Sequence, residues 1–195
     1  MPPKLFPETL NKTGFILVLF WLICNLMNIK ILLIASIIFL VSLTRLVPHL
    51  PNFTPILALA IFGGAYLPNK KTVFLIPISA MFLSDLILGF HSQIYAVYGC
   101  ILILSFLGRT IQNKINIRNL AITGISGSLI FFIVTNFSVW LGDNLYPLTL
   151  NGLIQCYVMA IPFFHNTLIS TFIFLAILFT GYSFAEKKYQ FLKKI

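Results

Sequence analysis

The chain has 195 residues, of which 59% are hydrophobic and 9% are charged, and its mean hydropathy is +0.99. Because soluble domains carry roughly 25% charged residues, this composition excludes a soluble domain and predicts a polytopic membrane protein. Thirteen Lys and Arg against four Asp and Glu give a formal net charge of +9, which in a soluble chain would suggest nucleic acid. Here the basic residues lie between and after apolar runs, so we expect the lipid bilayer as a partner and no nucleic-acid binding.

Residues 1–26 are interpreted as an N-terminal extension. They begin with a polar, proline-rich stretch, and the apolar run from Thr13 to Met27 has only about 15 residues, fewer than the roughly 20 that span a bilayer. Three alternatives fit this run: a signal-peptide core preceded by Lys4 and Lys12, an additional helix at the membrane surface, or a true start of translation at Met27. We favour an extension that is dispensable for function.

Residues 27–195 predict a single all-α transmembrane domain, a six-helix bundle with an additional apolar segment before it. Prolines and basic or polar turns separate the apolar runs. The last run is too long for one untilted span and contains Pro162, so we expect a short outer helix from Leu153 to Ile161 before the final helix. The helices are expected near residues 29–47, 55–67, 72–90, 94–107, 120–141 and 164–182.

The segment from Pro48 to Asp85 joins a proline-rich loop, a helix of small residues and a carboxylate inside an apolar helix. Small residues four apart, such as Ala60 and Gly64, permit close helix contact, so the second helix is expected to be buried in the bundle. An ionisable residue in lipid is costly, and it marks either a functional site or a structural pair. Arg45 and Asp85 lie toward the same end of their helices, so we expect them to pair, or one or both to face a substrate.

The distribution of basic residues predicts the orientation. With six helices, one side of the membrane receives nearly all Lys and Arg, and the other side receives only Arg45. The positive-inside rule makes the basic side, which includes the C-terminus, cytoplasmic. The loops P-H-L-P-N-F-T-P, H-S-Q and D-N-L-Y-P then gather on the outer side with the candidate site residues.

An outward pocket for a small molecule is the first functional hypothesis. Amides and aromatic rings around one charge suit a small polar ring compound, because buried ligands need a few well-placed polar groups among apolar walls. The candidate substrate-binding residues are Asn52, Asp85, Asn136, Trp140, Tyr146 and Asn166.

The alternatives are a metal-uptake protein and a structural membrane protein without a ligand. His49, His91 and His165 all fall on the outer side, where imidazoles would suit nickel, cobalt or zinc, but their scattered spacing is more typical of wetted interfacial residues. We expect no enzyme and no cofactor, because nucleophile, metalloprotease, phosphate-loop and paired-carboxylate motifs are all absent from the sequence. The three cysteines lie in apolar segments and are interpreted as packing residues: Cys24, Cys100 and Cys156.

A resemblance extends this interpretation. The succession R-L-V-P-H-L-P-N-F-T-P, G-G-A-Y, S-D-L-I-L-G-F-H, V-T-N-F-S-V-W and L-Y-P resembles an uncharacterised family of small bacterial inner-membrane proteins, over about residues 27–183. That family is similar, more loosely, to the substrate-binding S components of energy-coupling-factor (ECF) vitamin transporters. Six helices, a proline-containing loop after the first, a small-residue second helix and an Asp near the outer end of the third are the shared features.

The resemblance implies membrane transport in the bacterial inner membrane. An S component encloses a vitamin or metal ion between its outer loops and helix ends, and it meets energising transporter subunits on the cytoplasmic side. The first helix reads L-L-I-A-S-I-I-F-L, without the alanine-x-x-x-alanine pattern that many S components use to dock. No ATP-binding motif is present, so an ATP-driven step would need other chains.

Overall fold

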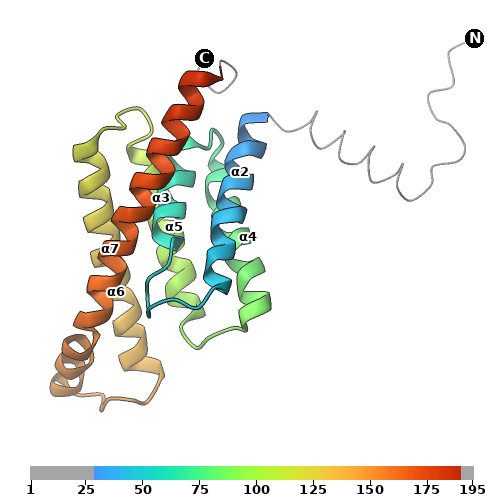
Figure 1. Ribbon diagram of the computed structural model, residues 1–195. Coiled ribbons are helices and arrows are strands. Elements are labelled where there is room, and N and C mark those ends of the chain that lie inside the picture. The colour runs from blue at the N-terminus through green and yellow to red at the C-terminus, as the bar shows by residue number, and fades with distance from the viewer. Residues whose placement is uncertain (1–28, 190–195) are drawn as a thin grey trace, which may run out of the picture.

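The computed structural model describes residues 29–189, and all regular structure in this range is helical. The expected six α-helices are present, with one short 3-10 helix (Figure 1). In chain order the elements are α2 (Ile29–Ser42), η1 (Leu43–Leu46), α3 (Ile56–Tyr66), α4 (Lys70–Leu88), α5 (Ile94–Thr110), α6 (Ile117–Gly142) and α7 (Leu150–Lys188). The interpretation of residues 1–26 as an extension lies outside the described residues.

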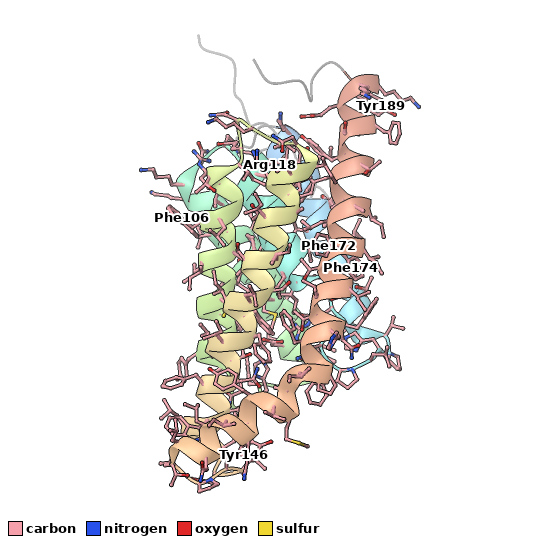
Figure 2. All side chains as sticks on the ribbon, turned by 90° about the vertical axis from the view of Figure 1, so that its left-hand side faces the viewer. Phe106, Arg118, Tyr146, Phe172, Phe174 and Tyr189 are labelled. Atoms are coloured by element: carbon pink, nitrogen blue, oxygen red, sulfur yellow. The ribbon has the colours of Figure 1, made fainter. Side chains whose placement is uncertain are left out.

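Three of these helices, α4, α6 and α7, are long and apolar enough to cross a membrane. The helices α3 and α5 are apolar but shorter, with 11 and 17 residues. Many large apolar side chains point away from the bundle, among them Phe106, which projects from its side in Figure 2. Such a surface suits lipid and not water. The helices and the composition together support a membrane protein.

The two ends of the bundle differ in charge. The start of α2, the α3–α4 and α5–α6 connections and the end of α7 lie together at the upper end in Figure 1, which we call the basic end. The distal end is formed by η1 and the loops 47–55, 89–93 and 143–149, and within the described residues Arg45 is its only Lys or Arg. The basic end carries Lys30, Lys70, Lys71, Arg109, Lys114, Arg118, Lys187 and Lys188.

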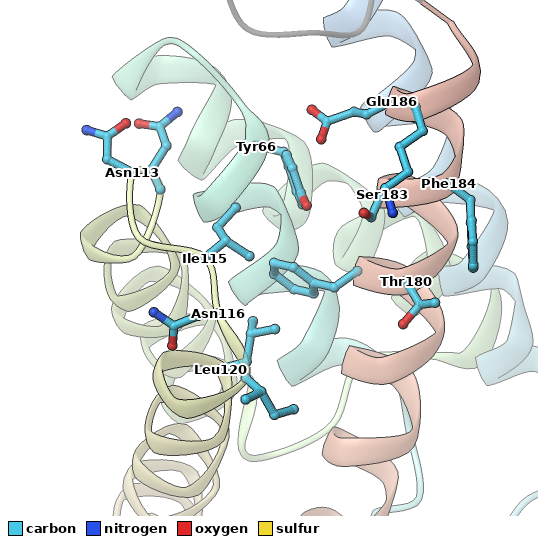
Figure 3. Close-up of a pocket in the computed structure, with 13 residues that line it drawn as sticks. Tyr66, Asn113, Ile115, Asn116, Leu120, Thr180, Ser183, Phe184 and Glu186 are labelled. Atoms are coloured by element: carbon cyan, nitrogen blue, oxygen red, sulfur yellow. The ribbon is translucent and has the colours of Figure 1, made fainter.

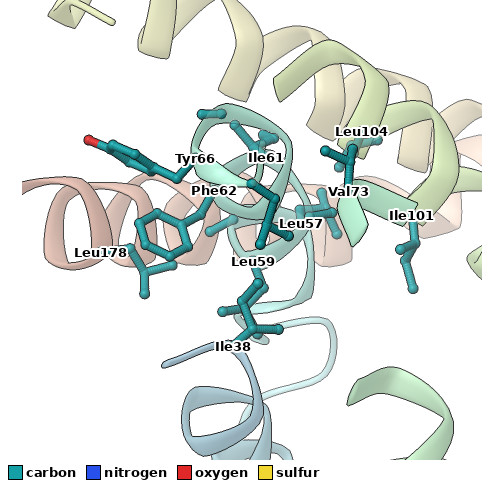
Figure 4. Close-up of a cluster of buried hydrophobic side chains, with 14 of the residues drawn as sticks. Ile38, Leu57, Leu59, Ile61, Phe62, Tyr66, Val73, Ile101, Leu104 and Leu178 are labelled. Atoms are coloured by element: carbon teal, nitrogen blue, oxygen red, sulfur yellow. The ribbon is translucent and has the colours of Figure 1, made fainter. Parts of the chain in front are cut away.

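The helix α3 is the buried centre of the bundle. Every residue from Leu57 to Tyr66 is buried, which confirms the expectation drawn from its small residues. Its side chains pack against Ile38 of α2, Leu104 of α5 and Leu178 of α7 (Figure 4). A helix that is apolar all round has no face suited to water, so it is stable only when neighbours surround it.

Two glycines bring the backbones of α3 and α5 together. A Cβ atom added at Gly64 would lie 2.1 Å from the carbonyl oxygen of Ser105, and one added at Gly108 would lie 2.2 Å from the carbonyl oxygen of Ile61. Because both obstacles are backbone atoms, no side-chain rotation relieves the overlap. The contact between the helices therefore requires glycine at both positions.

The last apolar stretch differs from the expectation. A break at Pro162 was expected, but α7 is one helix of 39 residues from Leu150 to Lys188 with Pro162 inside it. Figure 2 shows this helix bending in its lower part. In lipid an interrupted helix would expose several unpaired backbone groups, whereas a bend at a proline loses only one hydrogen bond, so the helix continues.

The first helix also differs, because α2 ends at Ser42 and the expected span to Val47 is completed by η1. The hydroxyl of Ser42 donates to the carbonyl of Phe39 at 2.7 Å, and that of Thr44 donates to the carbonyl of Val41 at 2.7 Å. These bonds satisfy carbonyls of the last turn, where the helix tightens. The other helices lie within a few residues of their expected bounds.

Alanine at Gly64 or Gly108 is expected to lower the free energy of unfolding by about 1–3 kcal/mol or more, because the α3 and α5 backbones must separate. Gly99→Ala in α5 is the matched control, since a Cβ there meets nothing within 4 Å. Unfolding by titration with sodium dodecyl sulfate in mixed micelles, followed by circular dichroism, measures the difference. Equal stability of Gly64→Ala and Gly99→Ala would contradict the close contact.

Candidate functional site

A cavity of about 770 Å³ lies at the distal end of the bundle. Its walls come from the start of α3, from α4 to α7 and from the loops between them, so segments far apart in sequence meet there. Most of the wall is apolar, with Val97, Phe131 and Val139 as examples. Small-molecule sites commonly have volumes of about 300–1,000 Å³ and this mixture of apolar walls and a few polar groups.

Polar side chains from five segments reach this cavity. The loop before α3 supplies Asn52, the loop before α5 supplies His91 and Gln93, α6 supplies Asn136 and the loop after it supplies Tyr146. Tyr146 marks the lower end of the molecule in Figure 2. Arg45 of η1 also lines the cavity. Apart from Arg45, none of these groups carries a permanent charge.

Arg45 and Asp85 form a buried ion pair beside the cavity. The Arg45 Nη1 atom lies 2.8 Å from Asp85 Oδ1, and the Asp85 side chain is 1% exposed. Tyr98 donates its hydroxyl to the other carboxylate oxygen, Oδ2, at 2.9 Å. Arg45 Nη1 also contacts Ser84 Oγ and, at 3.0 Å, the sulfur of Met81. Both oxygens of the carboxylate thus have a donor, which a buried charge requires.

The structure brings three of the six predicted site residues to the cavity: Asn52, Asn136 and Tyr146. Asp85 lies behind Arg45 and does not line the cavity. Trp140 and Asn166 do not line it either, and both hold loops that do.

The loops at the distal end are held by side-chain hydrogen bonds. Trp140 Nε1 donates to the carbonyl of Pro147 at 3.0 Å, within the loop that carries Tyr146. Asn166 Nδ2 donates to the carbonyl of Pro51 at 3.0 Å, which ties the loop before α3 to α7. These two residues therefore position the walls of the cavity.

Asn52 occupies the third position of a turn from Leu50 to Phe53. The Phe53 N–H donates to the Leu50 carbonyl at 2.9 Å, and Asn52 has φ +61°. Proline at the second position and Asn in the left-handed region at the third are typical of this kind of turn. The P-N pair in the sequence thus shapes the backbone and also places an amide at the cavity.

Sequence reasoning missed Gln93 as a site residue. Its Nε2 donates to Asp143 Oδ1 at 2.8 Å and so joins two distal loops, while its Oε1 is buried without a hydrogen-bond partner among the described residues. In the sequence Gln93 is a polar residue directly before an apolar helix at the predicted outer side, but many loop residues share that pattern. Arg45 was predicted as a partner of Asp85, with one or both charges facing a substrate as the alternative, and its place in the cavity wall depends on the tertiary structure.

The three histidines do not gather. His91 lines the cavity, but His49 and His165 do not, and His165 Nδ1 lies 2.9 Å from the carbonyl of Ile161 in its own helix. Between residues 29 and 189 no group of three or more His, Cys, Asp or Glu side chains is arranged to hold a metal ion. The geometry of the described residues therefore gives the metal hypothesis no site.

A second cavity, of about 640 Å³, lies at the basic end (Figure 3). Tyr66 of α3, Asn113 and Asn116 before α6, and Glu186 near the end of α7 line it. Glu186 Oε1 also lies 3.7 Å from Lys30 Nζ, and this ion pair joins the end of α7 to the start of α2. The sequence alone does not predict this cavity, because its residues come from three separate stretches of the chain.

Removing the Asp85 carboxylate should destabilise the fold. Asp85→Ala leaves Arg45 unpaired in a nearly buried position and is expected to cost about 3–5 kcal/mol of unfolding free energy. Tyr98→Phe removes one hydrogen bond to a charged group and is expected to cost about 1.5–3 kcal/mol. The double variant Arg45→Met, Asp85→Leu should recover most of the loss, because neither charge then remains alone.

The same micelle titration measures this series, with Asp143→Ala as the control at the other aspartate of the distal end. Asp143 lies in a loop and is only partly buried, so its loss should cost less than that of Asp85. A double variant as unstable as Asp85→Ala would show that the ion pair is not the source of the effect.

Residues 25–192 match the model of a family described as "Family of unknown function (DUF6580)", and the chain therefore belongs to that family. No curated protein matches the chain. No solved structure matches it either.

Proposed function

We propose that this member of the DUF6580 family captures a small polar molecule from the outer side of the bacterial inner membrane. It would act in membrane transport, as a substrate-binding subunit or as a small carrier. The distal cavity supports the proposal. It has a volume of about 770 Å³, and its mostly apolar wall also contains the polar side chains of Arg45, Asn52, Gln93 and Asn136. A site that filled space alone would have no need of polar groups from separate segments.

The charge difference between the two ends supports the proposed direction of capture. The basic end carries eight of the nine described Lys and Arg residues, so the positive-inside rule assigns it to the cytoplasm and the distal cavity to the outer side. The C-terminus follows α7 and would be cytoplasmic. Substrate entering from outside would meet the three distal loops first.

The resemblance to S components supports the transport class. Those proteins also bind at the outer ends of six helices, and they depend on separate energising subunits. This chain has no ATP-binding motif. Energising subunits are therefore proposed as partners, and the basic end is the surface that would face them.

Filling the cavity should displace a bound molecule. Val139 of α6 lines the cavity, and Val139→Trp is expected to abolish co-purification of a small molecule that native mass spectrometry detects on the gently extracted protein. Leu141→Trp is the matched control, because Leu141 lies two residues further along α6 and is 52% exposed. Both variants should stay folded, as checked by circular dichroism.

The proposal predicts a molecule on the native protein and on Leu141→Trp but not on Val139→Trp. A native protein without any bound small molecule, from cells grown in both rich and minimal medium, would count against capture. A molecule retained equally by all three proteins would place its binding elsewhere.

The orientation has a separate test. Alkaline phosphatase fused after the last residue should be inactive in cells, because the positive-inside rule keeps the C-terminus in the cytoplasm, while a fluorescent protein fused there should fluoresce. Fusions truncated in the loop 143–149 should give the opposite result. Active phosphatase at the C-terminus would reverse the orientation and turn the cavity toward the cytoplasm.

A further inference from the structure

The proposed function leaves the chemical class of the substrate open, and the inference here rests on that function. Arg45 is the most informative residue of the cavity, because its contacts to protein are all made by one nitrogen. Its Nη1 atom contacts Asp85, Ser84 and Met81. Within residues 29–189, Nη2 and Nε have no protein acceptor, and neither atom is fully buried.

A guanidinium held in this way presents its other edge to a ligand. The carboxylate of Asp85, which also accepts from the hydroxyl of Tyr98, fixes one side of the group. Two N–H donors in a rigid plane then remain, which is the geometry that binds a carboxylate through two parallel hydrogen bonds. The entropy of ordering Arg45 has already been lost in forming the ion pair, so a ligand need not order it again.

The remaining wall also favours an anion over a cation. Among the described residues no Asp or Glu lines the distal cavity. Asp85 is buried behind Arg45, and Asp143 lies behind Gln93, whose Nε2 donates to its carboxylate at 2.8 Å. Among the residues that line the cavity, a bound ammonium group would find amide oxygens but no carboxylate. Because most of the wall is apolar, a cation there would lose more hydration than the cavity replaces.

The charge of the site limits the ligand to one negative charge. Arg45 is already paired with Asp85, so the pair is neutral overall, and a phosphate group with about 1.5–2 negative charges would be poorly compensated. A carboxylate carries one charge and matches the free edge of the guanidinium. Apolar walls formed by residues such as Phe131 and Phe163 suit an apolar body on the same molecule.

We infer that the distal cavity binds a small organic monocarboxylate with an apolar body, whose carboxylate contacts Nη2 and Nε of Arg45. The proposed function names only a small polar molecule, and this inference adds the chemical class and the residue that recognises it.

Matched pairs of acids and amides test this class with the native protein. The probes are benzoate and benzamide, indole-3-acetate and indole-3-acetamide, and nonanoate and nonanamide, each pair sharing one apolar body. Isothermal titration calorimetry in detergent measures the affinities, and tryptamine serves as the cationic probe. We expect at least one acid to bind about tenfold or more tightly than its amide, and tryptamine not to bind.

Two arginine variants locate the effect. Arg45→Lys keeps a positive charge for Asp85 but loses the planar edge. The ratio of acid affinity to amide affinity should therefore fall to about one. Arg118→Lys at the exposed basic end makes the same chemical change away from the cavity and should keep the preference. The comparison of acid with amide in the native protein does not depend on either variant being folded.

Equal binding of acids and amides, tighter binding of tryptamine, or no binding of any probe would overturn the inference about monocarboxylates. The proposed function fails separately, when the native protein carries no small molecule and Val139→Trp changes nothing. A co-purifying neutral or cationic molecule that is lost in Val139→Trp would therefore keep the capture function and reject the acid.

Discussion

The carboxylate of Asp85 is buried, and three elements at the distal end of the bundle meet where it is paired. Burying one ion alone costs several kcal/mol, so the site is stable only with an opposite charge and donors for both oxygens. Arg45 and Tyr98 meet these requirements from η1 and α5, while Asp85 belongs to α4. Three elements are thereby fixed relative to one another, and the cavity takes one wall from this junction.

The short length of α3 determines which segments surround the distal cavity. With 11 residues this helix is about 16 Å long, roughly half of the hydrocarbon core. At its far end Phe62 and Tyr66 pack against Phe179 and Tyr182 of α7 with centroids 4.2–5.6 Å apart, and the second cavity lies beside these rings. Toward the distal end the loop 47–55 replaces the helix. Residues of this loop, among them Pro51 and Asn52, line the distal cavity.

The sequence predicted the features that depend on local chemistry. The small residues of α3 indicated burial, and the place of Arg45 and Asp85 near matching helix ends indicated that the two could meet. Features that depend on tertiary context were not accessible: Pro162 bends a helix that neighbours and lipid keep intact. Trp140 and Asn166 have the residue types of a binding site, but their donors contact loop carbonyls. Sequence alone cannot tell these two uses of one side chain apart.

The same ion pair sets how tightly a carboxylate could be held. At an effective dielectric constant of about 20, a charge about 4 Å from the guanidinium gains roughly 4 kcal/mol, and repulsion from a second carboxylate about 6.5 Å away removes roughly 2.5 kcal/mol. The small remainder means that Arg45 orients the ligand more than it retains it. Affinity would then come mostly from the apolar walls, and a rearrangement of the three distal loops that admits water would release the ligand. The proposed capture and delivery of a substrate would need this balance.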